Sequence, residues 1–282
     1  MKKVSAVIVT FNNAVMLKNL LADLSNQTLL PDEIIVVDSA SKDNTSMMVK
    51  NEFPDVRYLR LPENTGSAGG YYEGIKAALA NSDLIWTLDD DVRLERDSLE
   101  ELVKGFEKLD TAVELSSVRS VGVRQPNVAP HRLDIFPWRG SLIKTEIIKK
   151  YSLPIKEFFI YGEDLEYAMR FNSKGLHCYW IPSSVCIEKR QEGKDDYTIL
   201  GRTTRVYAFP FQLYYAFRNQ LYVFIRYREY CRLIHLLLYA FKATLCILIF
   251  RGEKRYERIS AIYKGLFDGC RSRLGKNIDY LP

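Results

Sequence analysis

The sequence predicts an α/β protein with a mostly parallel, doubly wound sheet followed by a helical extension. Short runs rich in β-branched residues alternate with segments of roughly ten residues whose apolar positions recur at helical spacing. Glycine and polar residues follow these runs, and the composition changes after about residue 190. Strands that alternate with helices form right-handed βαβ units and therefore parallel sheets.

Four strands are expected first, each from an apolar run that ends in polar residues. The runs are VSAVIVT (4–10), EIIVVD (33–38), VRYLRL (56–61) and DLIWTL (83–88). A helix is expected in each interval between them, and another directly after Asp91. Ligands of such sheets bind beyond the carboxyl ends of the strands, so the polar residues there should converge on one crevice.

The later elements are less regular. A strand is expected at 117–125, and a loop and strand entering a helix at 136–151. The segment 158–175 is an apolar run, a glycine turn and a helix, and two short strands, HCYWIP (177–182) and SSVCIEK (183–189), should follow it.

Composition suggests how the chain is divided. With 282 residues, of which 47% are hydrophobic and 27% charged, it suits one large domain with an extension, not a disordered chain or a polytopic membrane protein. We expect a first domain at 1–190, a linker at 191–208 and a helical region at 209–282. Residues 211–282 carry 13 Lys and Arg against 5 Asp and Glu, so the last region is basic.

The cysteines and the first residues bear on the compartment. Five scattered cysteines without CxxC spacing favour reduced thiols of a cytoplasmic protein over a disulfide framework or a zinc site. We expect no signal peptide, because the first apolar run is short and no small-residue cleavage site follows it.

Three adjacent aspartates, Asp89 to Asp91, end the fourth expected strand. A hard divalent cation prefers oxygen ligands, and two carboxylates in one turn can hold it while it bridges two phosphates. The alternative is that one aspartate caps the next helix and the others are solvated. The EF-hand and P-loop patterns are missing from the sequence.

Two further motifs fit a site for a nucleotide. The stretch Asn64–Gly70 offers unhindered backbone amides at a helix start, which can hold phosphate; the alternative is a flexible loop. Glu163 and Asp164 follow the apolar run 158–161. An acid beside an apolar wall can serve as a general base with a raised pKa, although a helix start also attracts acidic residues for its own stability.

Five motifs, in order and spacing, carry a family resemblance: VIVTFNN, IIVVDSASKDNT, ENTGSAGGYYEGI, LDDDV and FFIYGEDLEYAMR. Together they resemble the inverting nucleotide-sugar glycosyltransferases of family 2, with the GT-A fold, over residues 4 to about 190. The first domain would then be the GT-A catalytic domain. YYAFRN (214–219) is similar to the segment that follows this domain in galactofuranosyl- and rhamnosyltransferases of bacterial polysaccharide assembly, and the GED form of the acid motif is closer to the galactofuranosyl branch.

The resemblance implies roles at the donor. The nucleotide contacts would be Thr10, Phe11 and Asn12 at the pyrimidine, Asp38 at the base or ribose, and Asn64, Gly66 and Gly69 along the phosphates. Asp89 and Asp91 would hold Mn²⁺ or Mg²⁺, and Asp90 would touch the sugar. Many relatives place a metal-binding histidine where this sequence has Glu188, so we expect Glu188 as a third ligand.

The resemblance also implies roles at the acceptor. Asp164 would be the catalytic base, and Glu163 would bind the acceptor or a backbone amide. Trp138 and Arg139 would lie beside the acceptor; the alternative is a buried tryptophan and a surface arginine.

The C-terminal region suggests a membrane contact. LIHLLLYAFKATLCILIF (233–250) is apolar, but His235 and Lys242 interrupt it, and basic residues flank it. Such helices more often lie in the membrane interface than across it. The alternative is a buried helix, with an oligomer contact as one option. We expect no nucleic-acid partner, because no recognition motif accompanies the basic charge.

The combined expectation is a metal-dependent inverting glycosyltransferase at the inner face of the cell membrane. The first candidate for the donor is UDP-galactofuranose, and the second candidate is dTDP-rhamnose. The expected acceptor is a growing, lipid-linked bacterial polysaccharide. A nucleotidyltransferase is the rival enzyme, although Asn64–Gly70 lacks the Lys or Arg that it would need. A sugar-nucleotide binding module is the non-enzymatic rival.

Overall fold

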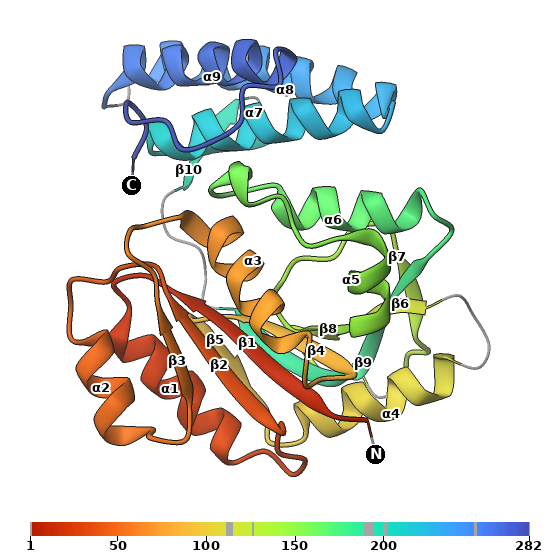
Figure 1. The fold of residues 1–282 in the computed structure, drawn as a ribbon. Coiled ribbons are helices and arrows are strands. Elements are labelled where there is room, and N and C mark those ends of the chain that lie inside the picture. The colour runs from red at the N-terminus through yellow and green to blue at the C-terminus, as the bar shows by residue number, and fades with distance from the viewer. Residues whose placement is uncertain are drawn as a thin grey trace. The chain divides into compact units, whose positions relative to one another are not determined.

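The structure is a computed structural model of the 282-residue chain. The residues that it describes are 2–110, 115–125, 127–188, 194–199, 202–250 and 253–281 (Figure 1). They form two compact units: unit 1 is 1–156 with 167–189, and unit 2 is 157–166 with 190–282.

Unit 1 begins with the predicted βαβ pattern. Its first strands are β1 (Val4–Thr10), β2 (Glu33–Asp38), β3 (Arg57–Arg60) and β4 (Leu84–Asp89). The helices between them are α1 (Ala14–Ser25), α2 (Thr45–Glu52) and α3 (Gly66–Ala78). The strands pair in parallel in the order β3-β2-β1-β4. Their carboxyl ends therefore share one edge of the sheet, as expected.

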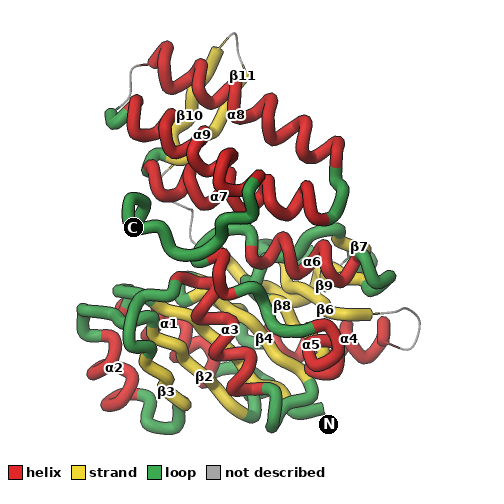
Figure 2. The backbone as a smooth tube through the Cα atoms, turned by 45° about the horizontal axis from the view of Figure 1, so that its top comes forward, coloured by secondary structure: helices red, strands yellow, loops and turns green. Residues whose placement is uncertain are grey.

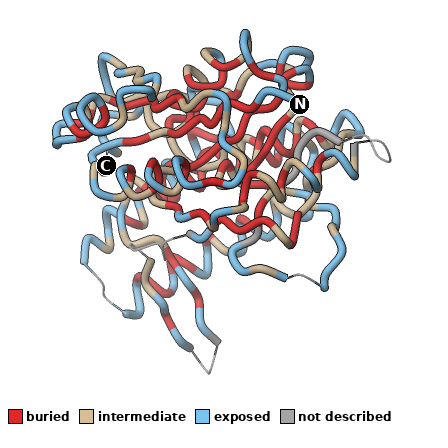
Figure 3. Tube along the Cα trace, turned by 90° about the horizontal axis from the view of Figure 1, so that it is seen from below, coloured by how far each residue is buried: buried red, intermediate tan, exposed pale blue. Residues whose placement is uncertain are grey.

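The side chains of β1 point alternately to the two faces of the sheet, which explains why helices cover both faces. Ala6 and Ile8 pack in one core cluster with the leucines of α1, whereas Val7 packs in another with Tyr71 and Ile75 of α3. Successive side chains of a strand point to opposite faces, so a run that is apolar throughout needs cover on both sides. Figure 3 shows the strands of this sheet largely buried.

The sheet continues with strands of both directions. β8 (Ser141–Lys144) pairs antiparallel with β4, and β6 (Leu115–Val121) pairs antiparallel with β8 and parallel with β9 (His177–Glu188). The helices here are α4 (Ser98–Asp110), α5 (Thr145–Tyr151) and α6 (Glu163–Asn172). The predicted α/β fold with a mostly parallel sheet is confirmed, with antiparallel strands added on one side.

Three local predictions for unit 1 are wrong. A strand, β5 (Val92–Leu94), follows the aspartates where a helix was expected, and α4 begins only at Ser98. A short strand, β7 (His131–Leu133), was not predicted. The two strands expected at 177–189 are one strand, β9, whose register against β6 shifts between Ser120 and Val121. β5 and β7 form because each pairs with β9, which lies far from both in sequence.

Unit 2 contains the predicted helical region. Its helices are α7 (Pro210–Arg226), α8 (Tyr230–Phe250) and α9 (Arg255–Cys270). Residues 157–166, which the sequence analysis placed in the first domain, pack with these helices. A Cβ atom on Gly265 would lie 2.5 Å from the Tyr214 carbonyl oxygen, and one on Gly269 would lie 2.4 Å from that of Arg218. The two glycines therefore let α9 lie directly against the backbone of α7.

The linker expected at 191–208 has regular structure in its described part. β10 (Lys194–Ile199) and β11 (Arg202–Tyr207) pair antiparallel and lie beside α8 and α9 (Figure 2). The polar composition concealed the strands because their contacts are polar: Arg205 donates to Asp196 at 2.8 Å. Tyr197 is buried and accepts a hydrogen bond from Arg258 of α9.

One helix of the described part of the chain, α8, is long and apolar enough to cross a membrane by length and composition. Its most apolar window has a mean hydropathy of 2.2, and 28% of that window is buried.

Candidate active site

The aspartate motif lies at the carboxyl end of β4. Asp89 accepts a hydrogen bond from the Tyr71 hydroxyl at 2.6 Å, and the Arg139 Nε atom lies 3.9 Å from its other oxygen. Tyr71 stacks on Trp138 with ring centroids 4.8 Å apart. Arg139, which was expected beside the acceptor, thus lies next to Asp89. Trp138 is only 3% exposed and also packs on Tyr167, so it takes the alternative role of a buried tryptophan.

Asp90 is held by the end of β1 and the residues after it. One of its oxygens accepts from the Thr10 hydroxyl at 2.6 Å and the other from the Asn13 amide at 2.9 Å. Burial raises the pKa of Asp90 to about 7; the two hydrogen bonds oppose this shift, and the charges of Asp91 and Asp89 add to it. Asp90 therefore holds its proton to a higher pH than an exposed aspartate does.

In metal-free buffer, Asp90→Asn should gain stability relative to the wild type as pH rises from about 4 to about 7. The folded-state pKa of Asp90 is above its ordinary value of 3.8. Between these two pH values the unfolded chain has lost the proton that the folded protein keeps, so the wild type loses stability as pH rises until the folded protein releases the proton too. The difference in unfolding free energy between Asp90→Asn and the wild type should grow by up to about 4 kcal/mol over this pH range and then level off.

Urea unfolding at about pH 4.5 and about pH 8, in EDTA, measures this difference. Asp55→Asn, at an exposed position, is the matched control. A stability difference for Asp90→Asn that is the same at both pH values would contradict the raised pKa.

The loops after β1 and β2 are tied together by Asn12. Its backbone N–H donates to the Ser41 hydroxyl at 2.8 Å, and its side-chain oxygen accepts from the Lys42 N–H at 2.7 Å. Asn12 has a positive φ of 52°, which asparagine tolerates better than most residues. Its side chain thus holds the loops, whereas Phe11 beside it is 37% exposed and presents an aromatic ring.

Asp38 is fully buried, and protein groups already satisfy it. The Ser41 N–H donates to one oxygen at 2.8 Å, and the other accepts from Arg60 at 2.8 Å and from the Tyr58 hydroxyl. Burial and the neighbouring Asp38 raise the pKa of Tyr58. As it stands, Asp38 orders the loop after β2, and a nucleotide would have to displace a protein partner or share an oxygen with it.

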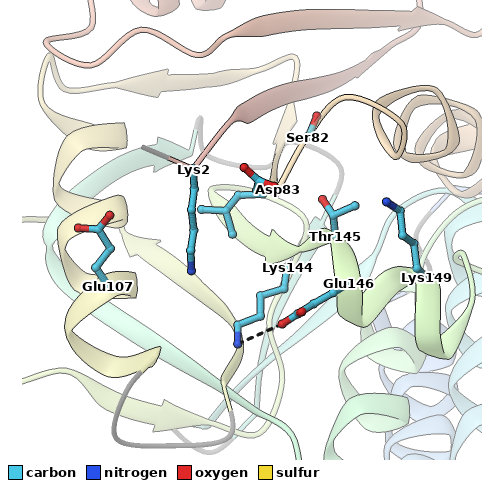
Figure 4. A pocket seen from close by; sticks show the side chains of 9 residues that line it. Lys2, Ser82, Asp83, Glu107, Lys144, Thr145, Glu146 and Lys149 are labelled. Atoms are coloured by element: carbon cyan, nitrogen blue, oxygen red, sulfur yellow. Dashed lines mark ion pairs between the residues drawn. The ribbon is translucent and has the colours of Figure 1, made fainter.

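A pocket of about 700 Å³ lies at this end of β2 and is lined by residues 41–44, Ser46, Met47, Lys50 and Arg60. Lys42, Lys50 and Arg60 make it basic. Another pocket, of about 600 Å³, contains Lys2, Asp83 and the ion pair of Lys144 with Glu146 at 3.5 Å (Figure 4). It lies where β4 begins and β8 ends, at the sheet edge opposite to Asp89, so it is not part of the candidate active site.

The glycine motif has a packing role. Asn64 accepts from the Gly66 N–H at 2.8 Å, and Gly66 has a φ of +69°. A Cβ atom on Gly69 would lie 2.5 Å from the Thr65 side chain, and one on Gly70 would lie 2.4 Å from Val9. Gly70 therefore lets the start of α3 approach β1 closely, and Gly69 leaves room for the Thr65 side chain.

The acid motif begins α6, and its first residues belong to unit 2. Glu163 is 4% exposed, whereas Glu166 is fully buried and accepts from the Tyr227 hydroxyl at 2.7 Å. Asp164 is half-buried, and one of its oxygens accepts from the Leu165 N–H at 2.7 Å. Of these three acids, Asp164 is the most accessible to a substrate.

The third expected metal ligand lies partly outside the described residues. Glu188 ends β9, opposite Val92, and its side chain is not among those described. Within the described side chains, no group of three or more His, Cys, Asp or Glu is arranged to hold a metal. Asp89 and Asp91 still fit a hard divalent cation, because both offer carboxylate oxygens. Burial raises the pKa of the nearby Cys186 to about 12, so this thiol is protonated in the protein without a metal.

Two residues that position the aspartates were given no role from the sequence: Tyr71, and Asn13, which was expected only as one of the polar residues at the end of the first strand. Asn13 directly follows the expected Asn12, and Tyr71 directly follows the glycine motif. A polar side chain next to a motif at a strand end was the available signal for both.

Comparisons with known proteins identify the family of the chain. The family model described as "Glycosyl transferase family 2" matches residues 5–164. Galactofuranosyltransferase GlfT1 of Mycobacterium tuberculosis (strain H37Rv) is 26% identical over 254 residues, 79% of this chain and 82% of that protein. The uncharacterized glycosyltransferase YwdF of Bacillus subtilis is 27% identical over 180 residues, and the match covers 63% of this chain and 65% of YwdF.

A solved structure is similar in fold. The crystal structure of S. aureus TarS has a TM-score of 0.50 and 17% identity, over 65% of this chain and 37% of that chain. The match of the family model spans more than half of the chain and includes the aspartate motif, the glycine motif and Asp164. This chain therefore belongs to glycosyl transferase family 2 and is an enzyme that transfers a sugar.

Proposed function

We propose that the enzyme transfers galactofuranose from UDP-galactofuranose to a hydroxyl of a growing, lipid-linked bacterial polysaccharide, with inversion at the anomeric carbon. The supporting observation is the extent of the similarity to GlfT1, which covers 79% of this chain, well beyond the part that the family model matches. The YYAFRN motif (214–219) lies beyond residues 5–164, which the family model matches. The second candidate donor is dTDP-rhamnose, because YYAFRN is also similar to the corresponding segment of rhamnosyltransferases.

The donor half of the reaction uses unit 1. Phe11 offers an exposed ring on which a pyrimidine can stack, and the amides at the start of α3 can bind phosphate. GT-A enzymes typically use a divalent metal, and Asp89 and Asp91 would hold Mg²⁺ or Mn²⁺ here. The bound cation supplies charge neutralisation to the departing diphosphate. Tyr71 and Arg139 fix the orientation of Asp89.

The acceptor half uses the acid motif. Asp164 takes the proton of the acceptor hydroxyl as its oxygen bonds to the anomeric carbon, and the bond from that carbon to the diphosphate breaks. One displacement from the opposite face inverts the anomeric centre. Glu163 and Glu166 are buried in unit 2 and are less accessible to the acceptor than Asp164 is.

A donor panel tests this function. UDP-galactofuranose, UDP-galactopyranose, UDP-glucose and dTDP-rhamnose are each added with and without Mn²⁺, and thermal shift and UDP or dTDP release are recorded. UDP-galactofuranose should give a metal-dependent shift and product release in the presence of a galactan acceptor. Release of pyrophosphate would instead identify a nucleotidyltransferase, and saturable binding without release would identify a binding module.

We also propose that α8 contacts the membrane surface, with the protein at its cytoplasmic face. Along α8, large apolar side chains between 41% and 61% exposed recur at helical spacing: Ile234, Leu237, Leu238, Phe241, Leu245, Leu248 and Ile249. The opposite side is packed, since Phe217 of α7 stacks on Tyr239, which also donates to the Arg205 carbonyl at 2.7 Å. A helix with one side packed and one apolar side exposed suits the interface of a bilayer, and the basic charge of residues 211–282 favours anionic lipid.

The double variant Leu238→Ser/Phe241→Ser should bind vesicles containing anionic lipid at least tenfold more weakly than the wild type. Added salt should weaken wild-type binding, because part of the attraction is electrostatic. Sedimentation with vesicles measures both effects, and Tyr256→Ser on α9, where the tyrosine is 69% exposed, is the matched control. Wild-type binding by the double variant would contradict the role of α8.

A further inference from the structure

The loop before the acid motif has an unusual backbone. Phe159, Tyr161 and Gly162 have φ values of 67°, 64° and 85°. Bulky aromatic residues rarely adopt positive φ, so this loop, Phe158–Gly162, needs outside contacts to keep its conformation. It leads directly into Glu163 and Asp164.

Asn219 of α7 supplies those contacts. Its side-chain amide nitrogen donates to the carbonyl oxygens of Phe158 at 3.1 Å, Ile160 at 3.0 Å and Tyr161 at 2.6 Å. The side chain is fully buried. One carboxamide therefore binds three of the four carbonyl groups from Phe158 to Tyr161, and a Cβ atom on Gly162 would lie only 3.1 Å from it.

Arg218 orients this amide. Its Nε atom donates to the Asn219 side-chain oxygen at 2.8 Å, which turns the Asn219 nitrogen toward the loop. Its two terminal nitrogens donate to the carbonyl of Phe158 at 2.8 Å and to that of Gly275 at 2.5 Å. Arg218 is 1% exposed. A lysine could not replace it, because only a guanidinium offers several donors in one plane.

We propose that Arg218 and Asn219 are positioning residues that hold Asp164 in place for catalysis through the loop Phe158–Gly162. The proposal rests on the proposed function, in which Asp164 is the base. It gives YYAFRN a physical role, because the last two residues of that motif set the backbone from which the acid motif starts. Neither residue needs to touch the substrate.

Asn219→Asp is the sharpest variant. It keeps the shape of the side chain but replaces the donating nitrogen by an oxygen, which repels the three carbonyl groups. Asn219→Ala removes the contacts, and Arg218→Lys keeps the charge but loses the planar donors. Val223→Ala, at a fully buried position of the same helix, is the control for a loss of stability alone.

Two measurements on the full-length protein test the proposal. Amide hydrogen exchange of residues 157–166, without substrate, reports the loop itself, where the N–H of Ile160 and that of Glu166 are hydrogen-bonded. Turnover and UDP affinity report catalysis. For Asn219→Asp and Asn219→Ala we expect exchange at least tenfold faster in this segment, kcat at least tenfold lower and UDP affinity within twofold of the wild type. Arg218→Lys should lie between these variants and the wild type.

The other outcomes separate a failure of the positioning role from a failure of the proposed function. Unchanged exchange in Asn219→Ala, or an equal loss of turnover in Val223→Ala at equal thermal stability, would overturn the positioning role. Faster exchange with normal turnover would overturn it as well, because the loop would then be irrelevant to catalysis. If the wild type transfers no sugar from any donor, the proposed function fails, while the exchange measurement still decides whether Asn219 holds the loop.

Discussion

Asp164→Asn should lower turnover by about two powers of ten or more, in line with the loss of a general base. Asparagine keeps the size and the hydrogen-bond acceptor of the side chain, so the N–H of Leu165 keeps its partner, but the variant cannot take a proton from the acceptor. UDP affinity should change less than about twofold, because the nucleotide is bound by other residues.

Glu163→Gln is the matched control, one residue earlier in the same helix start. Adjacent helical residues point about 100° apart, so only one of the two acids can face the anomeric carbon well. Glu163 is 4% exposed, and its variant should alter acceptor affinity or stability more than turnover. Near-normal turnover in Asp164→Asn together with an inactive Glu163→Gln would assign the base to Glu163.

Asp91→Ala should abolish turnover and remove the dependence of UDP affinity on Mn²⁺. With Asp91 gone, Asp89 is left as the expected carboxylate ligand on this turn, and it already shares its oxygens with Tyr71 and Arg139. Isothermal titration with UDP in Mn²⁺ and in EDTA measures the effect independently of catalysis. The pKa of Asp90 should also fall in the variant, because the charge of Asp91 contributes to raising it.

Asp97→Ala is the control for removing a carboxylate from the same region. Asp97 is paired with Arg124 at 2.5 Å, and its loss should leave the metal dependence intact. Full activity in EDTA, or metal-dependent UDP binding in Asp91→Ala, would end the assignment of Asp91 as a ligand.

The sequence predicted those elements whose structure depends on long local patterns. β1, β2 and β4 are apolar throughout and are buried on both faces, so periodicity and length were enough. β5 and β7 have three residues each and exist because β9 pairs with them. No local pattern can reveal a strand that is defined by a partner so far away in sequence.

In the candidate site, too, some residues were predictable from local sequence and others depend on distant partners. Asp89, Asp90 and Thr10 were predictable because strand ends meet at one edge of a parallel sheet. The sequence could not predict that Asp38 and Asn12 form hydrogen bonds within the protein. These bonds depend on side chains such as Arg60 and Ser41, which come from other parts of the chain. Asn219 was recognised as part of a motif, but its contacts lie about sixty residues away and only the structure shows them.

The contacts of Gly275 set an order of events during synthesis. Its N–H donates to the Glu157 carbonyl at 2.6 Å, and its carbonyl accepts from Arg218, so both sides of the acid loop depend on a residue made 111 positions after Asp164. At a ribosomal rate of about 5–20 residues per second, roughly 5–20 s separate the two. In that interval β1 to β4 can already fold and bind a nucleotide, while the loop before Asp164 lacks its fixed backbone. A nascent chain thus lacks the fixed loop before Asp164 until Gly275, five residues beyond the end of α9, has been made.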